Sequence, residues 1–250
     1  MDIVGYFAAL LIGTSLGLIG GGGSVLTVPV LVYLFGMDEI LAIAYSLFIV
    51  GTTSVVGSIA YLKKGWIDIR TAILFGIPSV LAVFFARIYI VPAIPGEVFK
   101  LNNFTVTKPV LLMLLFSILM IIASYSMIKK EKPVKEEQQK KKYAYFLIPA
   151  EGLFTGTLTG LIGAGGGFLI IPVLVNFVKL SIKTAIGTSL LIISLSSLMG
   201  FVLSIPQHSI QWPFLLEITS IAIIGILIGN YISTKIEGKK LKPAFGWFIL

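Results

Sequence analysis

Long apolar runs separated by short polar breaks make up almost the whole chain. The runs are hydrophobic on every face, so helical periodicity says little about them and their length decides how they are interpreted. Runs of about 20 residues can cross a bilayer as helices. The pattern predicts an all-α polytopic membrane protein with helices at residues 3–19, 25–35, 39–62, 68–91, 108–128, 144–162, 168–178, 182–205, 212–235 and 241–250. The last run is too short to span, which indicates an end that is truncated or lies at the interface.

The composition also indicates contact with lipid. Hydrophobic residues make up 57% and charged residues 12% of the chain, against roughly 45–50% and about 25% in soluble domains. A soluble domain could not cover that much apolar surface with so few polar groups. The absence of cysteine excludes thiol chemistry, iron–sulfur clusters and Cys-ligated zinc. The net charge of +8 comes mainly from lysines between the apolar runs, as in cytoplasmic loops of membrane proteins, so no nucleic-acid partner is expected.

A lysine-rich segment at residues 129–143 divides the chain into a first membrane repeat, 1–128, and a second, 144–250. The segment has seven lysines, three glutamates and no apolar periodicity, which predicts a flexible cytoplasmic linker. The two parts are copies of one unit, since residues 17–32 align without gaps with residues 160–175, and eleven of sixteen positions are identical. The same offset of 143 residues persists downstream, where Ser54 falls on Ser197 and Gly57 on Gly200.

Each copy contains a cluster of small residues, mostly glycines, inside its first apolar segment. Glycine costs up to about 1 kcal/mol relative to alanine in a helix, so the clusters predict helix breaks. In lipid, broken backbone is tolerated where it lines a cavity or packs on protein, and the half-helix that follows presents free amides to an anion. The candidate substrate-binding residues are those of the breaks and hydroxyl residues downstream: Gly20, Gly21, Gly22, Gly23, Ser24, Gly163, Ala164, Gly165, Gly166, Gly167, Ser46, Thr188 and Ser189. The alternatives are close helix packing for the glycines and bonds to backbone carbonyls for the hydroxyls.

The paired segments resemble those of the sulfite exporter TauE/SafE family of membrane permeases. The similarity lies in the doubled Gly-Leu-Ile-Gly-x-Gly-Gly…Pro-Val-Leu motif, followed in each copy by Ala-x-x-x-Ser-Leu. The first copy departs from the second at Ser24 and Tyr45, where the second has Gly167 and Thr188. The resemblance implies export of sulfite, a sulfonate or a related small sulfur-containing anion across the cell membrane, with no cofactor.

A few polar residues in or beside the apolar runs remain as further candidates. Arg87 lies within a span, where charge is costly, so it either reaches the interface or lies near an anion path; Asn230 takes its place in the second copy. His208 is the only histidine, and no further ligands are spaced for a metal site. A transporter requires no catalytic residue. An anion channel and an intramembrane enzyme are the alternatives, and the oligomeric state is left open.

The distribution of basic residues predicts the topology. If each glycine break is the tip of a hairpin that returns to its own side, 16 of the 19 Lys and Arg residues fall on one side and only Lys100 and Lys108 on the other. If each broken segment crosses the membrane, the distribution is nearly even, at 10 and 8. The positive-inside rule therefore favours re-entrant hairpins, inverted repeats with three crossings each, and an outer N-terminus.

Overall fold

The computed structural model describes residues 2–95, 97–101, 104–128, 141–162, 167–205 and 210–249, which are almost entirely helical. The elements up to residue 128 are α1 (Asp2–Ile19), the 3-10 turn η1 (Gly21–Gly23), α2 (Ser24–Tyr33), α3 (Glu39–Lys63), α4 (Ile69–Phe85), the π-helical turn η2 (Ala86–Ile90), α5 (Val91–Ala93), β1 (Glu97–Leu101), β2 (Phe104–Thr107) and α6 (Lys108–Ile128). Those that follow are α7 (Lys141–Ile162), α8 (Gly167–Asn176), α9 (Ile182–Ser204), α10 (Trp212–Lys235) and α11 (Gly238–Ile249).

Two segments differ from the helices and linker that the sequence predicts. The fold is helical as expected except at residues 97–101 and 104–107, where β1 and β2 pair as an antiparallel ribbon. This segment contains β-branched residues at positions 105–107, which favour strands. α7 begins at Lys141, so the last three residues of the predicted linker are helical; the rest of the linker lies outside the described residues.

Five helices in the described ranges are long and apolar enough to span a membrane: Leu41–Lys63, Ile69–Ala93, Val110–Ile128, Ile182–Val202 and Trp212–Lys235. They correspond to α3, to α4 with its continuation through η2 and α5, and to α6, α9 and α10. Large apolar side chains on their outer faces, such as Ile77, Leu81 and Ile224, are exposed. Surfaces of this kind are covered by lipid in a membrane protein, so the chain is a multi-pass membrane protein.

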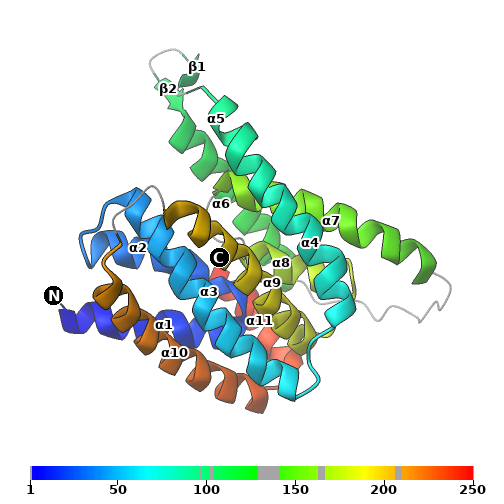
Figure 1. Cartoon of the computed structure of the whole chain (residues 1–250). Coiled ribbons are helices and arrows are strands. Elements are labelled where there is room, and N and C mark those ends of the chain that lie inside the picture. The colour runs from blue at the N-terminus through cyan, green and yellow to red at the C-terminus, as the bar shows by residue number, and fades with distance from the viewer. Residues whose placement is uncertain are drawn as a thin grey trace.

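Three helix pairs make the most extensive contacts in the molecule. α1 lies along α10, α4 lies along α7, and α3 packs on α9 (Figure 1). Glycines allow the closest approaches: a Cβ on Gly13 would lie 2.0 Å from the carbonyl oxygen of Ala222, and one on Gly156 would lie 2.2 Å from that of Ser79. Only glycine fits at these crossings, because any side chain would push the backbones apart.

α1 and α2 form a helical hairpin with the first glycine cluster at its tip. Gly20 ends α1 with φ of +76°, a left-handed conformation that side chains disfavour, and η1 then leads into α2. At the open end, Phe35 after α2 returns to the start of α1. A Cβ on Gly5 would lie 2.3 Å from Cζ of Phe35, and the Tyr6 ring centroid lies 6.3 Å from that of Phe35. The two arms therefore begin and end at the same end of the molecule.

The loops that follow α3, precede α9 and follow α10 lie together at the opposite end. Lys183 Nζ lies 4.9 Å from the ring centroid of Trp66 and donates a hydrogen bond to the carbonyl of Thr234 at 3.2 Å. The amide of Asp68 donates to Thr188 Oγ1 at 3.0 Å, which joins the start of α4 to α9. We call the end that carries Trp66, Lys183 and Thr234 the lysine-rich end.

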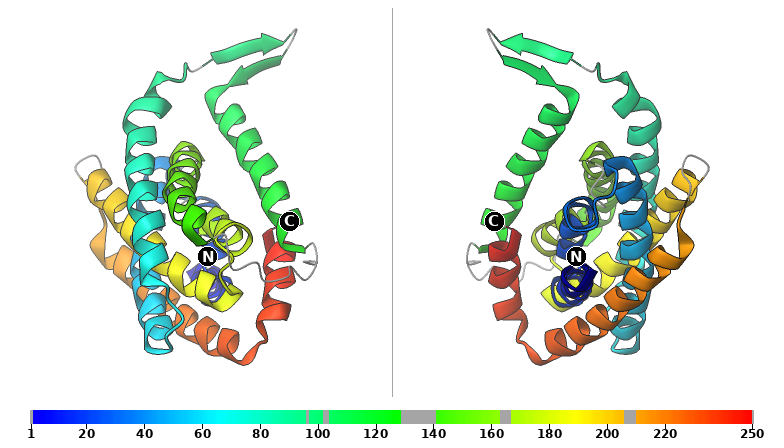
Figure 2. Two further views of the ribbon diagram at one scale, coloured as in Figure 1. Left: turned by 90° about the vertical axis from the view of Figure 1, so that its right-hand side faces the viewer. Right: turned by 90° about the vertical axis from the view of Figure 1, so that its left-hand side faces the viewer.

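The other end carries the β1–β2 ribbon, and we call it the ribbon end. Figure 2 shows α4 and α6 rising to the ribbon, which joins their ends. Near the start of α3, Tyr45 Oη accepts a hydrogen bond from the amide of Gln211 at 2.6 Å, so the segment before α10 lies here too. Each of α3, α4, α9 and α10 therefore runs between the two ends.

Candidate functional site

Gly21 of the first glycine cluster and Gly167 at the end of the second meet inside the molecule. A Cβ on Gly21 would lie 2.0 Å from the carbonyl carbon of Gly167, and one on Gly167 would lie 2.5 Å from Cα of Gly21. Backbone therefore touches backbone, and α2 and α8 both begin beside this contact. The first amides of a helix have no partner within it, and the helix dipole adds positive potential at the same place. Gly163, Ala164, Gly165 and Gly166 lie outside the described residues.

The predicted hydroxyl residues are hydrogen-bonded within the protein. Ser24 Oγ, Ser46 Oγ and Ser189 Oγ each donate to the carbonyl three residues earlier, at 2.7, 2.8 and 2.8 Å. Thr188 Oγ1 accepts the amide of Asp68. Ser189 is beside the first break, since its Oγ lies 3.1 Å from where a Cβ on Gly20 would be. The structure thus brings Ser24 and Ser189 to the first break, whereas Thr188 joins α9 to α4.

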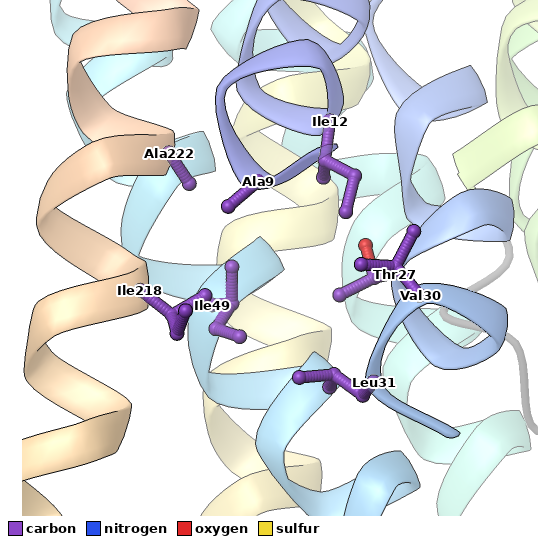
Figure 3. A pocket seen from close by; sticks show the side chains of 8 residues that line it. All are labelled: Ala9, Ile12, Thr27, Val30, Leu31, Ile49, Ile218 and Ala222. Carbon is purple, nitrogen blue, oxygen red and sulfur yellow. The ribbon is translucent and has the colours of Figure 1, made fainter. Parts of the chain in front are cut away.

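An apolar cavity lies beside the first break, between α1, α2, α3 and α10 (Figure 3). Its lining residues are Ala9, Ile12, Thr27, Val30, Leu31, Ile49, Ile218 and Ala222. The one hydroxyl among these eight, that of Thr27, donates to the carbonyl of Gly23 at 3.3 Å. Transfer of a charge into such a lining without a partner is strongly unfavourable, so this cavity does not suit an anion.

A second cavity, on the ribbon side, has different chemistry. It is lined by Leu47, Val83, Arg87, Thr159, Ser196, Ser197 and Gly200. Arg87 Nη1 lies 3.8 Å from where a Cβ on Gly200 would be. Thr159 and Ser197 are 8% and 1% exposed, and neither hydroxyl has a hydrogen-bond partner in the described structure. Buried hydroxyls are nearly always bonded, so a group that could accept two hydrogen bonds would suit this place.

The sequence alone pointed to Arg87 but not to Thr159 or Ser197 as candidate site residues. Thr159 reaches the cavity because α7 packs on α4: a Cβ on Gly160 would lie 2.7 Å from Cβ of Ala86. This pairing joins segments that are far apart in the chain, and no local pattern reveals it. The sequence did show that Ser197 aligns with Ser54 of the first copy, and this alignment could have drawn attention to Ser197. His208 lies outside the described residues, and those that are described contain no group of three or more His, Cys, Asp or Glu side chains that could hold a metal.

Comparison with known proteins assigns the family. The family model described as "Sulfite exporter TauE/SafE" matches residues 6–250. The chain belongs to the sulfite exporter TauE/SafE family. The resemblance carried by the paired glycine motif is thereby confirmed.

Relatives of this TauE/SafE family member carry transporter names. The chain is 30% identical over 246 residues to a "Probable membrane transporter protein" of Xylella fastidiosa, a match that covers 96% of this chain and 88% of the relative. It is 28% identical over 255 residues to "Probable membrane transporter protein YunE" of Bacillus subtilis, covering 93% and 88%. No solved structure matches the chain. The family and the relatives indicate a membrane transporter and not an enzyme.

Proposed function

We propose that the protein exports a small sulfur-containing oxyanion, such as sulfite or an organosulfonate, across the cell membrane, and that the anion binds at the glycine breaks. The contact between Gly21 and Gly167 carries this proposal. It brings the N-terminal ends of two half-helices together inside a transporter that belongs to a sulfite exporter family. Half-helix N-termini bind anionic groups in other transporters with broken helices.

The proposal includes inverted repeats with re-entrant hairpins. α7 aligns with α1 in the sequence, and α4 aligns with α10. In the structure α1 packs on α10 and α7 packs on α4, so each helix pairs with a helix of the other half. At 18 residues, α1 extends about 27 Å, less than the roughly 30 Å of a bilayer core. Its hairpin returns to the ribbon end. These observations support a first break that enters from the ribbon side and a second that enters from the lysine-rich side.

The charge distribution supports a cytoplasmic location for the lysine-rich end. Together with the linker, the loops assigned to this side hold 16 of the 19 Lys and Arg residues. Basic loops mark the cytoplasmic side of membrane proteins. The ribbon end, with Lys100 and Lys108, then faces outward.

Membrane potential is a sufficient driving force for export. Within the five spans the only acidic residue is Glu217, which lies in the second turn of α10 and is exposed. A proton relay in a span usually requires carboxylates or histidine. An interior-negative potential already expels an anion with about 2.3 kcal/mol per unit charge per 100 mV.

The test is sulfite flux from proteoliposomes that contain the full chain. With radiolabelled sulfite inside, an interior-negative potential of about 100 mV, set with potassium and valinomycin, should drive efflux toward a roughly 50-fold gradient for a monovalent anion. A pH gradient alone should drive little flux. Protein-free liposomes are the control, and saturable exchange with external unlabelled sulfite distinguishes a carrier from a channel. Flux that follows the pH gradient and ignores the potential would contradict this mechanism.

A further inference from the structure

Arg87 is a charged residue inside a predicted span that the glycine breaks do not explain. It lies in η2, six residues before the end of the span at Ala93, or about 9 Å along the helix axis. Pro92 lacks the N–H that would bond the carbonyl of Ile88 in an α-helix, which accounts for a local change of helix type here. Such π-helical turns recur at functional sites. An arginine at this depth is energetically unfavourable, and charged residues inside a membrane usually have a function. The residues around Arg87 should therefore indicate its function.

We propose that Arg87, Thr159 and Ser197 form a binding site for a small oxyanion between α3, α4, α7 and α9. The inference rests on the proposed function and adds to it a charged group and a location on the ribbon side of the path. A guanidinium offers five N–H donors in a plane that matches two oxygens of an oxyanion. The hydroxyls of Thr159 and Ser197 add one donor each.

The state of the two hydroxyls is the independent evidence for a ligand. Both side chains are more than nine-tenths buried, both line the cavity of Arg87, and neither hydroxyl has a partner among the residues that the structure describes. Ser196 lines the same cavity, but its hydroxyl donates to the carbonyls of Ile192 and Ile193 at 3.0 and 3.2 Å. None of the seven lining residues is acidic, so an oxyanion would meet donors without meeting a carboxylate there.

The cavity lies near the end of α7. Thr159 precedes Ile162, the last residue of α7, by three residues, which is about 4.5 Å along the helix axis. On the other side, a neighbouring cavity shares Arg87 and Gly200 and reaches the exposed side chains of Ile88 and Met199. An anion at Arg87 would therefore lie between the end of α7 and the outer surface of α4 and α9. A lipid phosphate group could supply the same chemistry from that surface, and the experiment separates the two sources.

The experiment measures sulfite binding by calorimetry to the purified full chain in neutral detergent. Arg87→Ala should weaken binding roughly 10- to 100-fold, because hydrogen bonds to a charged group are lost. Arg87→Lys should recover part of the loss, since lysine keeps the charge but not the planar pair of donors. Ser197→Ala should weaken binding about 2- to 10-fold. The matched variant Ser196→Ala should bind as the wild type does, because that hydroxyl already donates to its own helix.

The outcomes separate this site from the function on which it rests. If the wild type binds sulfite and the Arg87→Ala and Ser197→Ala variants bind equally well, the site is wrong while the proposed function stands. If the wild type neither binds nor transports sulfite, both fail. To test the lipid alternative, bound phospholipid is measured by phosphate analysis of protein purified from vesicles that contain phosphatidylglycerol. If Arg87→Ala loses bound phospholipid while its sulfite affinity is unchanged, the proposal is overturned. If Arg87→Ala does not fold, the sulfite affinities of Ser197→Ala and Ser196→Ala test the site, and equal affinities in the two variants would contradict it.

Discussion

Arg87 and Ser197 line a cavity on the ribbon side, whereas the aligned residues Asn230 and Ser54 are buried toward the lysine-rich end. Asn230 Nδ2 donates to the carbonyl of Gly57 at 3.4 Å. A Cβ on Gly57 would lie 2.6 Å from Cδ1 of Ile226, so apolar side chains occupy the space there.

An aromatic side chain closes the second region. Tyr61 is 1% exposed, and its hydroxyl pairs with Ser233 Oγ at 2.8 Å and donates to the carbonyl of Gly17 at 3.3 Å. The residue that aligns with Tyr61 is Ser204, which is much smaller. The aligned segments thus hold a charged cavity at one end. At the other they hold a neutral cluster in which Tyr61 and Ser233 are hydrogen-bonded, while Ser54 Oγ and Asn230 Oδ1 have no partner among the described residues. A few side chains are enough to make aligned segments chemically different.

The largest expected effect concerns the sides of the membrane on which the two ends lie. We expect the ribbon end and the lysine-rich end to lie on opposite sides. The chain has no cysteine, so single cysteines can be placed by Met37→Cys at the ribbon end and Lys179→Cys at the lysine-rich end. An impermeant thiol reagent added outside cells should label position 37 and spare position 179. A permeant reagent should label both. Outside labelling of both positions by the impermeant reagent would favour a single crossing by each broken segment.

The next largest effect is expected where the two halves touch. Gly21→Val should reduce sulfite flux to the level of protein-free liposomes, because its Cβ would lie 2.0 Å from the Gly167 carbonyl carbon and the breaks would have to separate. Gly36→Ala is the control, since nothing lies within 4 Å of a Cβ there and only its φ of +66° is unfavourable, at about 1–2 kcal/mol. Normal flux in the Gly21→Val variant would show that the contact is dispensable.

Tyr61→Ser gives the lysine-rich end the small residue of the ribbon end. We expect a loss of about 3–5 kcal/mol in the free energy of unfolding, since a large buried side chain is replaced by a void. Tyr61→Phe removes only the hydroxyl and should cost about 1 kcal/mol. Denaturant unfolding followed by tryptophan fluorescence measures both. Equal losses in the two variants would mean that the ring does not fill the region as the structure indicates.

The smallest effect is expected at Ser54. Its buried hydroxyl has no partner in the described part of the chain, so Ser54→Ala should change the free energy of unfolding by less than about 1 kcal/mol. It should also leave sulfite affinity unchanged, whereas the aligned variant Ser197→Ala weakens binding. Calorimetry on both variants makes the comparison. Equal weakening by the two would place the anion at both ends and remove the distinction between them.

Helix positions were largely predictable because the cause of each boundary is local. Long apolar runs end at polar, glycine or proline residues, so α3, α6 and α10 begin and end within a residue or two of the expected positions. The π-helical turn and the ribbon were missed. Pro92 predicts a disturbed helix but does not specify a π-helical turn, and the ribbon is a short segment with a weak pattern.

The sequence by itself determined that the protein lies in a membrane, that its two halves share an aligned motif, and that a glycine cluster separates α1 from α2, because composition, internal identity and glycine clusters are all local properties. Only the tertiary structure decided which residues meet. Gly21 meets Gly167, Thr159 meets the cavity of Arg87, and the bond from Tyr61 to Ser233 spans 172 residues. The physical reason is that these helices are apolar on every face, so the sequence does not reveal which face packs on protein and which contacts lipid. Close packing of glycine-lined faces made that choice, and with it placed the buried hydroxyls beside a charge.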